Sequence, residues 1–231
     1  HEGYQYSVRQ LMKDLGDERI SSVQQADVLG PLGSLMTVSK DYQVAIDQIL
    51  GASIQNIVVK DERVASRLIQ HLRQQRLGRA VFLPLAQLRP HPVARCDIAA
   101  LEGQPGFIGL ARDLVDFAPQ AKVAMDYRLG RTLVAETIDL ALALHQRSGR
   151  RHAWVTLDGD TIQPGGAMAG GQKQQRSQGL GILERQEELK AAKLEQPKLK
   201  AQYQSLAKKT QAMLAQKKQV QLALEEAQID F

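Results

Sequence analysis

The chain has 231 residues, of which 43% are hydrophobic but only 4% aromatic, and a formal net charge of +5. This length accommodates one domain of about 150 residues with extensions, and its core must consist mostly of aliphatic side chains. A single cysteine, Cys96, excludes an internal disulfide and a Cys-x-x-Cys zinc site, and is compatible with a reducing cytoplasm.

The ends of the chain and its charge distribution limit the class of protein further. A run of 18 apolar residues is missing, so we expect no membrane-spanning helix, and the N-terminus has neither a signal-peptide core nor an initiator methionine. The missing methionine indicates a fragment of a longer chain. Residues 172–231 hold 11 of the 30 basic residues but 7 of the 25 acidic ones. This excess permits contact with nucleic acid, and a solvated helix face explains it equally well.

Helical periodicity marks both ends of the chain. Tyr4, Val8, Leu11 and Leu15 have the spacing of one apolar seam. From about residue 180 onward, apolar residues recur in heptads with Gln and Lys at the outer positions, which is typical of a coiled coil. Pro197 lies inside this pattern and predicts a kink or a break.

Residues between these helical segments alternate between strand and helix patterns, which indicates an α/β layer. Predicted strands cover residues 34–39, 54–60, 80–85, 131–134 and 152–157. Predicted helices cover residues 41–50, 61–77, 119–129 and 136–147. Asp41 is the expected N-cap of the first of these helices, and Gly51 is its expected end. Residues 88–106, rich in Pro and Gly, form a loop or a linker. We therefore predict two α/β subdomains that share one fold.

Two glycine pairs follow the last predicted strand, namely Gly165, Gly166, Gly170 and Gly171. Glycine loses the most backbone entropy on ordering, so paired glycines are useful where φ must be positive or where another backbone approaches closely. The approaching group is either a phosphate or another protein chain.

A phosphate-binding enzyme is one interpretation, because glycine-rich loops at helix starts bind phosphates. A Walker A loop needs Lys after its second glycine, whereas Gln172 follows Gly171 here. Asp158 and Asp160 could be imagined as metal ligands, but Asp-Gly-Asp is more typical of a turn between strands. His71, His91, His145 and His152 also lack the spacing of metal ligands, and the fifth histidine, His1, lies at the terminus. We therefore predict no catalytic residue, no metal site and no cofactor in this chain.

Two segments of the central zone have a distinctive order of residues. The first is Gly-Arg-Ala-Val-Phe-Leu-Pro-Leu at residues 78–85. The second is Thr-Leu-Asp-Gly-Asp at residues 156–160, followed by Pro-Gly-Gly-Ala-Met-Ala-Gly-Gly at residues 164–171. A domain with these segments between two helical arms resembles the hinge of bacterial SMC (structural maintenance of chromosomes) proteins. The resemblance covers essentially the whole chain, and residues 50–52 and 129–134 also look like that family.

This resemblance implies a mixed α/β (α+β) fold in which residues 20–178 are a two-subdomain hinge dimerisation domain. Residues 1–19 and 179–231 are then antiparallel coiled-coil arms that lead to distant ATPase heads outside this chain, so the chain itself is not an enzyme. Family hinges form a homodimer by pairing backbone strands at two interfaces. We assign this role to the four glycines, Gly165, Gly166, Gly170 and Gly171. A loop that needs glycine only for its own turns is the alternative.

The family also binds double- or single-stranded DNA, without sequence preference, near the junction of hinge and coil. Lys173 and Arg176 occupy that place here, and Arg150 and Arg151 could add to the patch; ordinary solvated charges are the alternative. Such contacts go to phosphates and weaken with salt. Trp154 lies inside a predicted strand, so we expect it in the core rather than on a base-stacking surface.

The family's biology supplies the remaining expectations. The parent protein would be an ATPase that condenses and segregates chromosomes together with kleisin and accessory subunits, in the cytoplasm and associated with the nucleoid. A coiled-coil scaffold that dimerises without a DNA role of its own remains an alternative function.

Overall fold

The computed structural model describes residues 4–171 and, in the C-terminal segment, residues 192, 195–211, 213–214, 216–218 and 220. The chain divides into two compact units, His1–Arg185 and Gln186–Phe231. Among the described residues, none of the helices combines the length and the apolar character needed to cross a membrane.

The first unit contains one order of elements twice. In each half a strand, a second strand, a helix, a third strand, another helix and a fourth strand follow one another. The first half consists of β1 (Val28–Pro31), β2 (Met36–Val38), α2 (Gln43–Leu50), β3 (Ile57–Val59), α3 (Glu62–Gln74) and β4 (Phe82–Pro84). The second half consists of β5 (Phe107–Leu110), β6 (Val115–Phe117), α5 (Lys122–Leu129), β7 (Thr132–Ala135), α6 (Ile138–Arg147) and β8 (Ala153–Thr156). The prediction of two subdomains with one fold is confirmed.

Further elements precede, connect and follow the two halves. Helix α1 (Tyr6–Gly16) comes first, α4 (Arg95–Ala99) lies in the linker, and β9 (Thr161–Ile162) and β10 (Met168–Ala169) follow β8. Short 3-10 turns occupy Gln25–Asp27, Leu32–Leu35, Lys40–Tyr42, Gly51–Gln55, Ala111–Leu114 and Pro119–Ala121.

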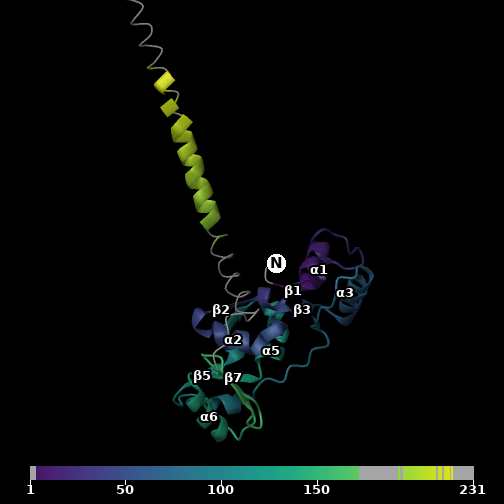
Figure 1. Cartoon of the computed structure of the whole chain (residues 1–231), viewed down its shortest axis with the longest axis vertical. Coiled ribbons are helices and arrows are strands. Elements are labelled where there is room, and N and C mark those ends of the chain that lie inside the picture. Colours follow the sequence, from purple (N-terminus) through teal and green to yellow (C-terminus); the bar gives the residue numbers. More distant parts are fainter. Residues whose placement is uncertain are drawn as a thin grey trace, which may run out of the picture. The chain divides into compact units, whose positions relative to one another are not determined.

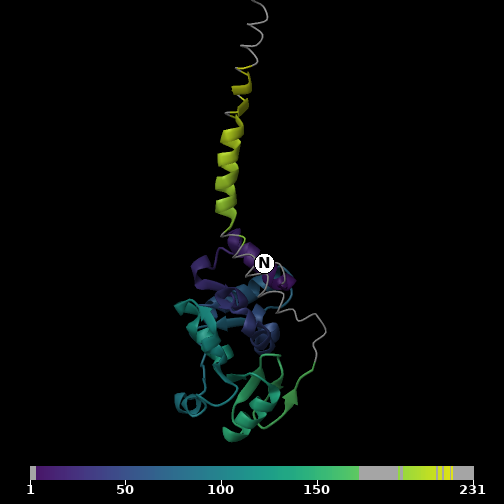
Figure 2. The ribbon, with the colours of Figure 1, turned by 90° about the vertical axis from the view of Figure 1, so that its left-hand side faces the viewer.

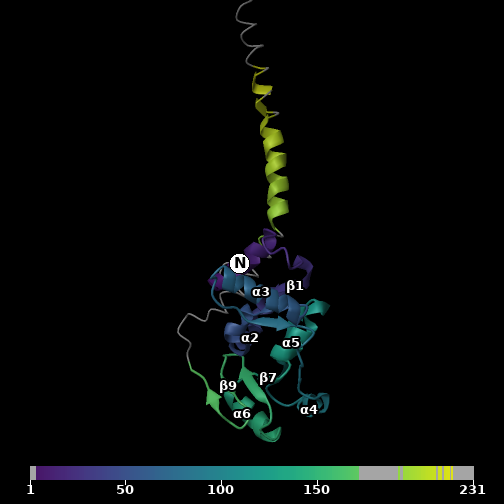
Figure 3. The ribbon, with the colours of Figure 1, turned by 90° about the vertical axis from the view of Figure 1, so that its right-hand side faces the viewer.

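The two halves are joined by strand pairing. In each half the third strand pairs antiparallel with the first and parallel with the fourth, so Val58 lies opposite Leu83 and Val134 opposite Val155. One sheet has the order β1-β3-β4 and the other β10-β9-β8-β7-β5. Strand β2 pairs antiparallel with β6 across the halves. Figure 2 shows the first half, in purple and blue, and the green sheet of the second half toward opposite ends of this unit. Figure 3 shows α3 at the end of the first half and α6 at the end of the second.

The main hydrophobic core draws side chains from both halves. Ile46 of α2, Met125 and Leu129 of α5, and Val134 of β7 are fully buried in it. A smaller cluster under α6 contains Trp154, whose ring meets that of Phe107 edge-on with centroids 6.1 Å apart. Burying each such side chain contributes roughly 1.5–3 kcal/mol. The prediction that Trp154 belongs to the core is confirmed.

Several element boundaries differ from the predicted ones. Helix α3 begins at Glu62, one residue after the predicted start at Asp61. Asp61 is its N-cap, and its Oδ1 accepts hydrogen bonds from the backbone N–H groups of Arg63 and Val64 at 3.0 and 2.9 Å. Helix α2 begins later than predicted, because a 3-10 turn contains Asp41, which does not cap it. Strands β1, β5 and β6 are not predicted by the sequence, since glycine or neighbouring turns interrupt their alternation.

Helix α1 packs against α3 inside the first unit (Figure 1). Its residues Val8, Leu11 and Leu15 are buried in the main core. Asp14 is also buried, and its Oδ2 lies 2.9 Å from Nε2 of His71 on α3. The described part of residues 1–19 therefore contributes to the main core of the first unit, while its assignment as an arm stays a prediction.

Residues 195–211 of the second unit are helical, Pro197 included. Of the kink or break predicted at Pro197, the break is therefore wrong for these residues, and the kink stays a prediction. Proline removes one intrahelical hydrogen bond and bends a helix more readily than it ends one. Large apolar side chains recur every seven residues at described helical positions of this unit and are more than 60% exposed in the single chain: Leu199, Leu206, Met213 and Val220. This exposed seam is what a coiled-coil arm without its partner helix presents.

The buried Asp14 carboxylate should stabilise the contact of α1 with α3. Burial by itself raises the pKa of Asp14, but hydrogen bonds from His71 and Gln10, and the charges of His71 and Arg19, outweigh it and lower the pKa below its ordinary value. A carboxyl with a lowered folded-state pKa contributes stability above the unfolded-state pKa of about 3.9 and loses it as pH falls through the lower folded value.

We therefore predict that Asp14→Asn reduces the free energy of unfolding by about 1–3 kcal/mol at pH 7, measured by urea denaturation. The difference from the parent should shrink as pH falls below about 4. The exposed Asp17→Asn is the matched control and should change stability by less than about 0.5 kcal/mol. A difference for Asp14→Asn that is equal at pH 7 and pH 3 would contradict the role of its charge.

Candidate dimerisation and nucleic-acid interface

Residues 164–171, which contain the two glycine pairs and are called the glycine segment below, form a hairpin with β9 at the end of the five-stranded sheet. Strands β9 and β10 pair antiparallel, with Met168 opposite Ile162 and Ala169 opposite Thr161. The backbone N–H of Gln163 donates to the carbonyl of Ala167 at 2.7 Å and closes the turn. The segment thus supplies the last strand of a sheet, which the sequence alone does not identify.

The local backbone conformation explains why each of these four positions is a glycine. Gly165, Gly166 and Gly171 have φ angles of 87°, 102° and 117°, which other residues rarely adopt. A Cβ at Gly170 would collide with the Asp160 carboxylate, whose Oδ1 accepts a hydrogen bond from the Gly171 N–H at 3.1 Å. The local turns therefore account for all four glycines, and their role in an interface stays a prediction.

Residues 158–160 form the turn that connects β8 to β9. The Thr156 N–H donates to the carbonyl of Asp160 at 2.9 Å, and Gly159 has a φ of 89°. This geometry is that of the predicted turn between strands. Across the part of the chain that the structure describes, groups of three or more His, Cys, Asp or Glu that could hold a metal ion are missing.

Strands β4 and β10 are edge strands of their sheets. In an antiparallel pair of strands, residues that lie opposite each other alternate between hydrogen-bonded and non-hydrogen-bonded pairs. Gln163 and Ala167 form a hydrogen-bonded pair, so the next pair, Ile162 and Met168, is not hydrogen-bonded. The N–H and C=O of Met168 therefore point away from β9. In β4 the Val81 carbonyl accepts from Ile57 of β3 at 2.8 Å, so the N–H and C=O of the next residue, Phe82, point away from β3.

Exposed apolar side chains accompany both edges. Val81 is 58% exposed and Met168 is 50% exposed, although both are large aliphatic residues. Pro84 lies on the open side of β4, where its missing N–H shortens the stretch that could pair. The sequence predicts a strand at residues 80–85 but does not identify it as an edge; the signal for the edge is Pro84, which cannot donate to a strand ladder.

The structure describes two of the four basic residues predicted to bind DNA, Arg150 and Arg151. Arg150 is exposed at the turn before β8, and its carbonyl accepts a hydrogen bond from the Gly165 N–H at 3.1 Å, which joins this turn to the glycine segment. The Arg151 guanidinium lies 3.7 Å from the Asp97 carboxylate, which offsets part of its charge. Lys173 and Arg176 lie outside the described residues.

Comparisons with known proteins agree with this geometry. The family model for the flexible hinge domain of SMC proteins matches residues 25–145. The chromosome partition protein Smc of Desulfitobacterium hafniense is 37% identical over 212 residues, which cover 92% of this chain and 17% of that protein. The Smc protein of Bacillus subtilis is 33% identical over 178 residues, 77% of this chain and 14% of that protein. The chain thus spans under a fifth of the length of these relatives.

Solved structures give the same result. An asymmetric dimer of the Geobacillus stearothermophilus SMC hinge domain matches with a TM-score of 0.72 and 30% identity, over 84% of this chain and 75% of that one. The Pyrococcus furiosus SMC hinge domain matches with a TM-score of 0.54 and 26% identity, over 72% of this chain and 90% of that one. With a family model that matches more than half of its residues, the chain belongs to the family of SMC flexible hinge domains.

Proposed function

We propose that this chain is the homodimerisation hinge of a chromosome-organising SMC protein, in which it joins two long coiled-coil arms. The observation that carries the proposal is a pair of sheet edges, β4 in one half and β10 in the other, that none of the described strands covers. Exposed edges promote unwanted strand pairing, so folded proteins usually cover or blunt them. Two open edges that each carry an exposed apolar side chain are best explained as surfaces that a second chain covers.

The arrangement of the edges fits a two-fold dimer. If β4 of one chain pairs with β10 of its partner, symmetry repeats the same contact with the roles exchanged, and the β4 and β10 edges of both chains are covered. Phe82 and Met168 each offer one outward N–H and one outward C=O for this pairing. The Geobacillus hinge domain was crystallised as an asymmetric dimer, which supports dimerisation and leaves open whether both contacts close together.

In this proposal the glycine segment both shapes its own turns and exposes β10 to the partner chain. The turns at Gly165, Gly166 and Gly171 present β10 as an edge, and residues without a Cβ let another backbone approach closely. Because the same glycines shape their own chain, replacing them with alanine would disturb folding and pairing together. Met168 separates the two effects, since its outward backbone groups take no part in the ladder with β9.

We predict that Met168→Pro weakens the dimer at least about tenfold, because it removes the outward N–H on which the edge pairing depends. The measurement is the dissociation constant by analytical ultracentrifugation, and circular dichroism checks that the fold is retained. Met168→Ala is the matched control, since it removes the side chain but keeps the N–H. Equal dissociation constants for Met168→Pro and the parent would rule out pairing through β10.

We further propose that the dimer binds duplex or single-stranded DNA without sequence preference, through Lys173 and Arg176 with Arg150 and Arg151 nearby. The local excess of basic residues and the family relationship support this proposal. The parent protein would then be an ATPase that condenses and segregates chromosomes with kleisin and accessory subunits, in the cytoplasm and at the nucleoid. A scaffold that dimerises without binding DNA is the alternative function.

Charge reversal separates these functions. If Lys173 and Arg176 of both chains each contact one phosphate, log K should fall with log salt concentration at a slope of about −3.6. Lys173→Glu with Arg176→Glu should make the slope clearly shallower in fluorescence anisotropy with duplex DNA, because these phosphate contacts are lost. Lys208→Glu with Lys209→Glu, on the exposed helix of the second unit, is the matched double reversal and should leave affinity nearly unchanged. A scaffold would bind DNA equally poorly in all three forms.

A further inference from the structure

A cavity of about 390 Å³ lies between the linker, the last turns of α2 and α5, and the five-stranded sheet. Side chains alternate between the faces of a strand. Leu133, Trp154 and Ile162 face the cluster under α6, so the neighbouring residues Thr132, Val155 and Thr161, which line the cavity, face the other side of the sheet. The cavity therefore lies on the face of the sheet opposite α6, although Trp154 of that cluster and Gln163, whose N–H closes the hairpin turn, also border it.

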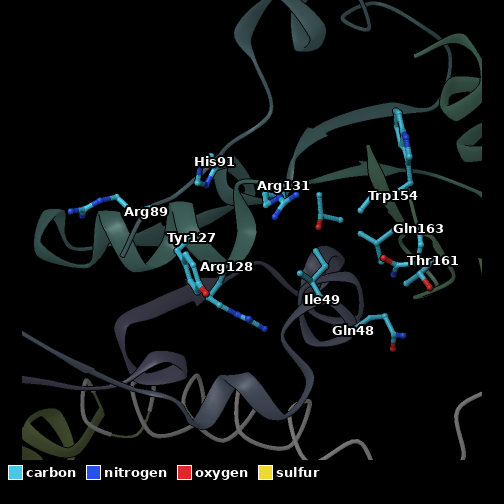
Figure 4. Close-up of a pocket in the computed structure, with 13 residues that line it drawn as sticks. Gln48, Ile49, Arg89, His91, Tyr127, Arg128, Arg131, Trp154, Thr161 and Gln163 are labelled. Carbon is cyan, nitrogen blue, oxygen red and sulfur yellow. The ribbon is translucent and has the colours of Figure 1, made fainter. Parts of the chain in front are cut away.

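Positive charge dominates the lining of this cavity. Arg89, Arg128 and Arg131 line it together with His91, and Asp and Glu are missing from its lining. Within the described part of the chain, these arginines make no ion pair. Figure 4 shows Arg89, His91 and Tyr127 on one side of the cavity, Thr161 and Gln163 on the other, and Arg131 between them.

Arg128 is the most constrained of these cations. Its guanidinium donates a hydrogen bond to the Ser53 hydroxyl, while its Nε is buried without a hydrogen-bond partner in the structure. Burial lowers the pKa of Arg128 below its ordinary value, yet arginine stays protonated near neutral pH. A half-buried cation without a carboxylate partner is costly for the folded chain, and a bound anion would remove that cost.

The backbone offsets only part of this charge. The carboxyl ends of α2 and α5 lie at the cavity, and each helix end carries about half of a negative charge. Together they compensate about one of the three arginine charges. Uncompensated charges in a concave site with a low-dielectric wall raise the local concentration of counter-ions. The remaining charge therefore favours an anion in the cavity.

The neutral hydrogen-bond donors of the cavity favour a phosphate over a carboxylate. Gln48, Thr161 and Gln163 offer amide or hydroxyl groups from different sides, while the arginines offer several N–H groups each. A phosphate has tetrahedral oxygens that accept hydrogen bonds from several directions, whereas a carboxylate accepts them largely in one plane. The volume lies within the range of small-ligand pockets.

We propose that this cavity binds a phosphate group, with Arg128 and Arg131 as its principal ligands. The phosphate belongs either to a DNA backbone that passes the cavity or to a free phosphorylated small molecule. Both sources present the same chemistry to the arginines.

Isothermal titration of the 231-residue chain with pyrophosphate, at low salt, tests the site. Arg128→Gln with Arg131→Gln should weaken binding at least about tenfold, because two charge-assisted contacts are lost. Arg131→Gln alone keeps the Arg128–Ser53 contact, so it tests the site even if the double variant is unstable, and should weaken binding about threefold or more. Arg9→Gln with Arg73→Gln, at exposed positions outside the cavity, removes the same charge and should change affinity less than twofold.

Competition with duplex DNA identifies the source of the phosphate. Mutual competition that disappears in the double variant assigns the site to DNA phosphates. Pyrophosphate binding that depends on the arginines, with DNA binding that does not, assigns it to a small molecule. The proposal is overturned if the parent shows neither pyrophosphate binding nor arginine-dependent DNA binding, or if the exposed control loses as much affinity as the cavity variants. Dimer mass is measured separately, so failure here leaves the proposed hinge function untouched.

Discussion

The packing of the two halves against each other is the constraint on which the other features of this domain depend. Strand β2 pairs with β6, and α2 contacts α5, so aliphatic side chains from both halves enter one core. Because this core joins the two sheets, β4 and β10 are edges of one folded unit rather than of two separate subdomains. The arginine cavity depends on the same packing, since its walls come from both halves.

Edge strands explain why the glycine segment looks unusual in sequence. Its positive φ angles turn the chain twice and leave Met168 with unpaired backbone groups on the outside. A loop that only needed to turn would not require an exposed methionine beside these groups. The glycines are thus needed for local folding, whereas Met168 between them is needed for the proposed partner binding. Substitutions at Met168 therefore distinguish the two effects.

The sequence predicts the longer elements well because their signals are local. Asp61 caps α3 by short-range hydrogen bonds, and strands β3, β7 and β8 are apolar runs between clear turn residues. Strands β1 and β5 are each bulged at a glycine, Gly30 and Gly109, which breaks the alternation that would reveal them. The edge at Phe82 and the cavity between Gln48 and Gln163 arise only when distant segments pack, so spacing along the chain could not predict them. Lys173 and Arg176, predicted from the family resemblance, lie outside the described residues.

The central claim is that the globular unit dimerises without help from its arms. The most direct measurement is the solution mass, by multi-angle light scattering, of a chain that ends at residue 178. It must retain residues 1–19, because Leu11 and Leu15 of α1 belong to the hinge core. A mass twice that of the trimmed chain is the predicted result. A monomer at concentrations where the full chain is dimeric would assign association to the exposed heptad seam and contradict the account.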